Sequence, residues 1–164
     1  MIKLRLPALV LSLSLLAACG TQPSPGSAAT PAAAASSGSQ GEATVSVGDT
    51  TIRASAVQTA MLDAGVASRY GIARDPATVL LLVTVRKGND ADAVSLPATV
   101  TATATDLRGG RQEIVMRALD TGDLVDYAGT VATTLPETLR FDVAVAREGA
   151  GTATLQFSRD FFPL

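Results

Sequence analysis

Apolar and polar side chains alternate with a period of two residues through most of the chain from Glu42 onwards. This is the spacing of half-buried β-strands, because successive side chains of a strand point to opposite faces. Gly48-Asp49 and Gly109-Gly110 stand between alternating runs as turns, and each of them predicts a hairpin. The pattern predicts eight short strands, at residues 44–47, 52–56, 79–85, 94–106, 112–119, 124–132, 138–147 and 152–161.

Eight strands in about 120 residues are typical of a two-layer β-sandwich around one hydrophobic core. The run 79–85 is apolar at nearly every position, so it suits a central strand with both faces covered. No internal repeat or second domain boundary interrupts the pattern, and residues 42–164 are expected to form one all-β domain. The inward spacing assigns these side chains to the core: Phe141, Val143, Val145, Leu155 and Phe157.

One segment, Thr59–Thr78, breaks the two-residue period. Gly71 stands where a helix would stop, and Asp75-Pro76 separates the segment from the next strand. The segment therefore predicts one short helix near residues 61–70, crossing between the two sheets. The apolar positions with helical spacing are Met61, Leu62, Val66 and Tyr70.

The first 18 residues have the features of an export signal. Lys3 and Arg5 give a positive start, and the apolar run Ala8–Leu16 is too short to span a bilayer. Leu16-Ala17-Ala18-Cys19 then resembles the bacterial lipobox, whose cysteine sulfur receives a diacylglyceryl group before cleavage. Lipobox proteins gain a further acyl chain on the freed amine, and two anchoring signals hold a protein stably. Residues 1–18 are thus the predicted lipoprotein signal peptide, and Cys19 the predicted lipidated residue; the alternative is a plain signal peptide with an incidental cysteine.

The stretch Gly20–Gly41 consists of Thr, Gln, Pro, Ser, Ala and Gly without a charge, which predicts disorder. A flexible coil of this length averages about 25 Å from end to end and reaches about 70 Å when extended. Residues 19–41 are therefore expected to form a lipid-anchored linker. Gly20 stands where inner-membrane lipoproteins commonly have Asp, so the resemblance to sorted lipoproteins favours the periplasmic face of the outer membrane.

Motifs spread over nearly the whole predicted domain carry a family resemblance. They include Tyr70-Gly71-Ile72 after the predicted helix and Phe161-Phe162-Pro163 near the C-terminus, within the stretches GDTTIRASAV, LDAGVASRYGIARD, LLLVTVRKG, ATVTATATDLRG and LQFSRDFFP. Together they resemble a family of exported bacterial proteins known as domain of unknown function 4426. The resemblance implies an immunoglobulin-like sandwich and brings no established activity, catalytic residue or cofactor. The lipobox and long linker depart from the cleaved signal expected in this family.

Cys19 is the only cysteine, and the chain has no histidine. Lipidation of Cys19 would leave no thiol for a disulfide, a catalytic thiolate or a zinc site. Without histidine, the chain lacks histidine-based triads and the commonest transition-metal ligand. Removal of Lys3 and Arg5 with the leader leaves 11 basic and 15 acidic residues, a net charge of −4. This charge argues against nucleic acid as a partner. The expected partners are the membrane, through the anchor, and an envelope protein.

Arg69, Tyr70 and Arg74 form a candidate binding patch on the predicted helix, suited to an anionic group or a carboxylate-bearing peptide. The alternative is that Tyr70 packs on the sheet while both arginines lie in solvent.

Two acidic stretches are weak calcium candidates, since carboxylate oxygens are the ligands that calcium prefers. The first contains Asp120, Asp123 and Asp126 around a glycine, and the second is the stretch 89–92. Neither has EF-hand spacing, and Asp and Gly are what turns require in any case.

These observations favour a non-catalytic binding or adaptor module of the periplasm, which holds its partner through a strand edge or the helix patch. A small-ligand or calcium-binding protein is the alternative. A hydrolase is a third hypothesis, and it would need paired carboxylates that face each other across a cleft. The sequence predicts no cofactor, and no serine stands in a G-x-S-x-G elbow.

Overall fold

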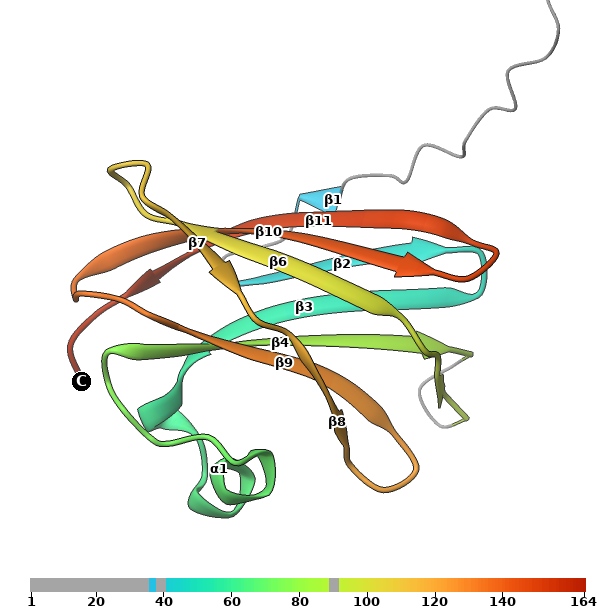
Figure 1. Cartoon of the computed structure of the whole chain (residues 1–164), viewed down its shortest axis with the longest axis horizontal. Coiled ribbons are helices and arrows are strands. Elements are labelled where there is room, and N and C mark those ends of the chain that lie inside the picture. The colour runs from blue at the N-terminus through green and yellow to red at the C-terminus, as the bar shows by residue number, and fades with distance from the viewer. Residues whose placement is uncertain (1–35, 38–40, 89–91) are drawn as a thin grey trace, which may run out of the picture.

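A computed structural model describes residues 36–37, 41–88 and 92–164 and has the predicted all-β sandwich architecture. Two sheets pack face to face, and their strands are antiparallel apart from the short β1 (Figure 1). The five-stranded sheet has the order β1 (Ser36–Ser37), β11 (Gly151–Phe161), β10 (Glu137–Arg147), β6 (Thr99–Thr105), β7 (Arg111–Ile114). The six-stranded sheet has the order β2 (Glu42–Val47), β3 (Thr50–Gln58), β4 (Thr78–Lys87), β9 (Val125–Ala132), β8 (Arg117–Asp120), with β5 (Val94–Ser95) paired to β4.

The core lies between the sheets and is built from every second residue of the long strands, as the alternation predicts. Three phenylalanines anchor the five-stranded side: Phe141 stacks on Phe157 at 5.0 Å between ring centroids and meets the edge of Phe161 at 6.4 Å. Such offset and edge-to-face pairs add about 0.5–1.5 kcal/mol beyond the burial of their area. All five side chains assigned to the core from their spacing are buried: Phe141, Val143, Val145, Leu155 and Phe157.

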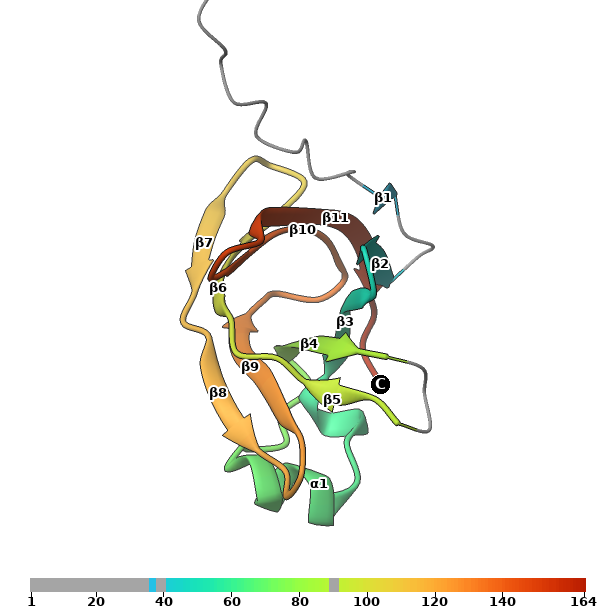
Figure 2. The same ribbon diagram turned by 90° about the vertical axis from the view of Figure 1, so that its right-hand side faces the viewer.

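Two of the predicted strands are divided between the sheets. The run 94–106 breaks at Pro97 into β5 and β6, and the run 112–119 breaks at Val115 into β7 and β8. Figure 1 and Figure 2 show β7 and β8 following one line across the edge of the sandwich, from one layer to the other. The crossing passes closely over Gly129 of β9, where a Cβ atom would lie 2.6 Å from Ile114 Cγ2 and 2.8 Å from the Val115 oxygen.

The sequence pattern predicted a helix that crosses between the two sheets, and this prediction is wrong. β3 and β4, the strands that the helical segment joins, are neighbours in the six-stranded sheet, and α1 (Ala64–Tyr70) covers the outer face of that sheet after a 3₁₀ turn, η1 (Thr59–Met61) (Figure 2). Asp63 caps α1 by accepting hydrogen bonds from the backbone N–H groups of its first turn, and Gly71 ends it with φ of 62°. This segment explains why β4 is apolar on both faces, because Leu80 of β4 is buried in one cluster with Ile72 of the loop after α1.

Part of the predicted linker lies against the domain. Ser36 and Ser37 pair in parallel with Leu155 and Gln156 of β11, and the Gly41 N–H donates to the Ser158 oxygen at 3.1 Å. The predicted signal peptide, Cys19 and the rest of the linker lie outside the described residues. Among the residues that are described, no helix has the length and apolar character to cross a membrane.

Candidate functional site

The three residues of the candidate helix patch do not gather into one cationic site. Arg69 and Arg74 are exposed, but Arg74 donates from Nη2 to the Ala60 oxygen at 2.7 Å and so fastens the 3₁₀ turn. Tyr70 is half-buried and packs with the outer cluster that contains Leu80 and Ala128. The position of Tyr70 therefore matches the structural alternative, in which this side chain packs on the sheet.

A buried polar network lies on the same outer face, under α1 and β5. Arg86 of β4 forms an ion pair with Asp126 of β9, and their side chains are only 17% and 11% exposed. Arg86 also donates to the Ser95 hydroxyl and to the Val125 oxygen, both at 2.8 Å. Burial raises the pKa of the Tyr70 phenol, and the negative charge of Asp126 raises this pKa further. The network therefore connects β4, β5 and β9, and the Tyr70 phenol of α1 lies within the influence of its Asp126 charge.

The calcium candidates are not brought together. Asp120 and Asp123 are exposed, whereas the carboxylate of Asp126 is engaged by Arg86. Among the described residues, no group of three acidic, cysteine or histidine side chains could hold a metal ion. The second candidate, the stretch 89–92, lies outside the described residues except for Asp92.

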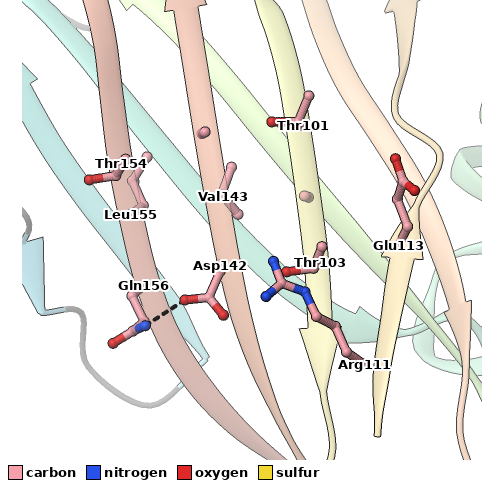
Figure 3. Close-up of a pocket in the computed structure, with 11 residues that line it drawn as sticks. Thr101, Thr103, Arg111, Glu113, Asp142, Val143, Thr154, Leu155 and Gln156 are labelled. Atoms are coloured by element: carbon pink, nitrogen blue, oxygen red, sulfur yellow. Dashed lines mark hydrogen bonds between the residues drawn. The ribbon is translucent and has the colours of Figure 1, made fainter.

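A hollow with a volume of about 400 Å³ opens on the outer face of the five-stranded sheet, over β6 and β10. We call it the β6–β10 hollow. It exists because the outward side chains of its floor are small: Thr101 and Thr103 come from β6, and Ala144 from β10. Larger polar side chains border this floor, with Arg111 and Glu113 on β7 and Gln156 on β11 (Figure 3).

Strand register sets the polar groups of the β6–β10 hollow in order. Glu113, Thr103, Asp142 and Gln156 form one row across four strands, because each is the paired neighbour of the next. Asp142 is already engaged: Gln156 donates to its Oδ1, and Arg140 lies 3.4 Å from its Oδ2. Figure 3 shows the Arg111 side chain reaching from β7 toward Thr103, while the Glu113 carboxylate points away along the strand.

Arg111, Glu113 and the Thr103 hydroxyl lie at the β6–β10 hollow and have no partner of their own. In the described part of the chain, neither Arg111 nor Glu113 forms a salt bridge. The Thr103 hydroxyl is buried and has no hydrogen-bond partner. Buried polar groups nearly always find a partner, so an unpaired one calls for a ligand or water at that place. The hollow therefore offers a donor, an acceptor and a hydroxyl to whatever enters it.

The sequence patterns did not identify this site. Arg111 and Glu113 come from β7, whereas Asp142 and Gln156 come from the later hairpin of β10 and β11. Only the register of these strands with β6 makes the four residues neighbours. One local signal was present: β6 reads TVTATAT, so its outward positions are all threonine. A strand with uniformly short outward side chains leaves space above its face.

The family model for DUF4426, a domain of unknown function, matches residues 44–163. The chain belongs to the DUF4426 family. The match covers α1 and both sheets apart from β1 and the first two residues of β2, and it confirms the resemblance found in the sequence motifs. No curated protein matches the sequence.

Solved structures agree with the fold of this DUF4426 chain. A DUF4426 family protein from Pseudomonas aeruginosa PAO1 superposes with a TM-score of 0.63 at 24% identity, covering 76% of this chain and 97% of that one. FetP from uropathogenic Escherichia coli strain F11, expressed in the periplasm of E. coli, gives a TM-score of 0.51 at 12% identity, covering 76% and 95%. A copper-bound variant of FetP gives 0.50 at 12% identity, covering 74% and 95%.

Proposed function

We propose that this DUF4426 protein is a non-catalytic binding module of the bacterial envelope, anchored through Cys19, which holds its ligand in the β6–β10 hollow. The observation that carries the proposal is the set of unpaired groups, Arg111, Glu113 and the Thr103 hydroxyl, at a hollow of about 400 Å³. Ligand sites of proteins typically measure about 300–1,000 Å³ and hold a few convergent polar groups.

An envelope location is supported by the export signal and lipobox of the sequence, and by the fold shared with FetP, which was expressed in the periplasm. The copper of FetP does not extend to this chain. The chain has no histidine, and no metal-holding group of acidic, cysteine or histidine residues lies in the described ranges. Imidazole is a common ligand of copper, and a chain without histidine has none to offer.

Catalysis is not part of the proposal, although two carboxylates, Glu113 and Asp142, border the β6–β10 hollow. They stand on strands separated by β6, which places their Cα atoms about 9–10 Å apart. Glycosidases give their general acid a buried, apolar environment. Here Glu113 is exposed, and the Asp142 carboxylate is already bound by Gln156 and Arg140. Neither side chain has the surroundings of a general acid.

Photocrosslinking in living cells tests the binding role. A photoreactive residue at Thr101, which is exposed at the β6–β10 hollow, is compared with one at Ser46, which is exposed on the opposite sheet. Mass spectrometry should identify a recurrent adduct from position 101 only. Ala144→Phe fills the hollow and should abolish this adduct, whereas Ala118→Phe, on exposed β8, should leave it unchanged. An equal yield from positions 46 and 101, or insensitivity to Ala144→Phe, would contradict the proposal.

The anchor has a separate test. Membrane fractions should contain the intact protein and resist carbonate extraction, and Cys19→Ala should release the protein into the soluble fraction. Membrane association that survives Cys19→Ala would show that another feature holds the protein there. This result would leave the role of the β6–β10 hollow unaffected, because the crosslinking comparison does not depend on the anchor.

A further inference from the structure

Two opposite charges without ionic partners lie on one face of β7. Arg111 and Glu113 are two residues apart, so both side chains stand on the face of the sheet that carries the β6–β10 hollow, and both border it. A strand rises about 3.3–3.4 Å per residue, which places the two backbone positions about 6.7 Å apart. In Figure 3, the guanidinium reaches toward Thr103 and the carboxylate points away from it. Although they are neighbours, the two groups do not form a salt bridge with each other.

The remaining polar groups of the β6–β10 hollow leave these charges available. Asp142, the nearest additional charge of the row, is held by Gln156 and Arg140. Arg140 is thereby directed to Asp142. The Thr103 hydroxyl, which can both donate and accept, lies in register with Glu113 and has no partner. The free groups therefore include one cation, one anion and the Thr103 hydroxyl.

We propose that the β6–β10 hollow binds a short peptide with free termini, of dipeptide size, with its carboxylate on Arg111 and its ammonium group on Glu113. This inference rests on the proposed binding function and names its ligand class. An extended chain spans about 3.3–3.6 Å per residue, so the termini of a dipeptide are about 7 Å apart, which is close to the spacing of the Arg111 and Glu113 backbone positions along β7. The peptide group between the termini has one donor and one acceptor, which the Thr103 hydroxyl can serve.

The charge pattern discriminates against other small ligands. Charge-assisted hydrogen bonds are about twice as strong as neutral ones, and an arginine fork fits a carboxylate with two parallel bonds. A ligand with only one charge would leave either Arg111 or Glu113 beside it without a partner. A free amino acid has both charges, but they are too close together to contact Arg111 and Glu113 at the same time. The ligand class is thus set by two charges and their separation.

Calorimetric titration of the full chain in detergent tests this inference with L-alanyl-L-alanine as the probe. The dipeptide should bind, and acetylation of its amine or amidation of its carboxylate should each weaken binding at least tenfold. L-alanine should bind at least tenfold more weakly than the dipeptide. If blocked and free dipeptides bind equally, the proposed charge recognition is wrong; if alanine binds as tightly as the dipeptide, the ligand is an amino acid and the separation argument fails.

Single substitutions assign each terminus to its side chain. Arg111→Gln should weaken binding of the free dipeptide and make its affinity insensitive to amidation of the carboxylate. Glu113→Gln should make the affinity insensitive to acetylation of the amine. Arg108→Gln and Glu148→Gln change the same charges at exposed positions outside the hollow and serve as matched controls. If both variants lose sensitivity to the same terminus, the proposed orientation is wrong.

The two proposals fail in different ways. If no dipeptide binds but the crosslinked adduct from Thr101 persists and is lost in Ala144→Phe, the β6–β10 hollow is a binding site for another ligand and only the peptide inference is overturned. If neither dipeptide binding nor the adduct is found, both proposals are wrong. Thr103→Val retains the shape of the side chain without the hydroxyl, and it should weaken dipeptide binding while leaving the two terminal preferences intact.

Discussion

The Arg86–Asp126 ion pair provides a quantitative test of how the outer network holds β4, β5 and β9 together in the six-stranded sheet. The two side chains are 17% and 11% exposed, so solvent screens their attraction only weakly. Removing one partner of a buried pair typically destabilises a protein by about 3–5 kcal/mol, because the other charge stays buried without compensation. Because the pair keeps some exposure, we expect Asp126→Leu and Arg86→Met each to lower the free energy of unfolding by about 3 kcal/mol, near the lower end of this range.

Urea unfolding followed by circular dichroism measures this effect. With slopes of about 1–3 kcal/mol per molar urea, a loss of 3 kcal/mol lowers the unfolding midpoint by about 1–3 M. The double variant Arg86→Met/Asp126→Leu removes both charges and should lose far less than the sum of the single variants, because apolar replacement of a buried pair is often neutral. This non-additivity separates a buried pair from two independent defects.

The exposed pair of Lys87 and Asp49 is the matched control, with nitrogen and oxygen 3.3 Å apart and side chains 53% and 65% exposed. Its single variants should leave the urea midpoint almost unchanged, since exposed pairs contribute little. If the Arg86 and Asp126 variants behave like this control, or if their effects simply add, the two charges do not act as a buried pair and the reasoning is refuted.

Three further outcomes follow from the contacts described above. Gly129→Ala should lower stability by about 1–3 kcal/mol in thermal unfolding, because its Cβ would lie 2.8 Å from the Val115 oxygen. The pKa of Tyr70 is raised above its ordinary 10.0, so the stabilisation linked to its protonation is complete below pH 10 and is lost as pH rises through the folded-state pKa. Asp126→Asn should lower this pKa in an absorbance titration. Tyr70→Phe should remove the loss of stability at alkaline pH. Calcium should leave the melting temperature unchanged, since Asp126 is engaged by Arg86; a clear rise would restore the calcium reading.

The alternation of side chains predicted the strands well because a sandwich buries one face of each strand. It could not show to which sheet a strand belongs. The run 94–106 alternates without a break, yet Pro97 separates β5 from β6 and the two pair in different sheets. Alternation records which way a side chain points relative to the core, and both sheets face the same core. A strand that changes sheets can therefore keep its pattern intact.

The helix was predicted at nearly its observed position, because Gly71 is a local signal that acts within one turn. The prediction that the helix crosses between the two sheets was wrong. A crossing between sheets and an excursion over one sheet both need a short amphipathic helix between two strands. The information that distinguishes them lies in β4, where Leu80 and Leu82 are apolar on the face opposite to the core. A central strand with two apolar faces requires a cover, and α1 is that cover.

The β6–β10 hollow shows why function was less predictable than fold. Its floor depends on small outward residues, which β6 displays in its own sequence as Thr101, Thr103 and Thr105. Its chemistry depends on a row that runs perpendicular to the chain, from Glu113 through Thr103 to Asp142. A shift of β7 by one residue would turn Arg111 and Glu113 to the opposite face of the sheet. The same register that completes the core thus also determines which charges border the hollow, and a sequence pattern can reveal them only after the strands have been paired.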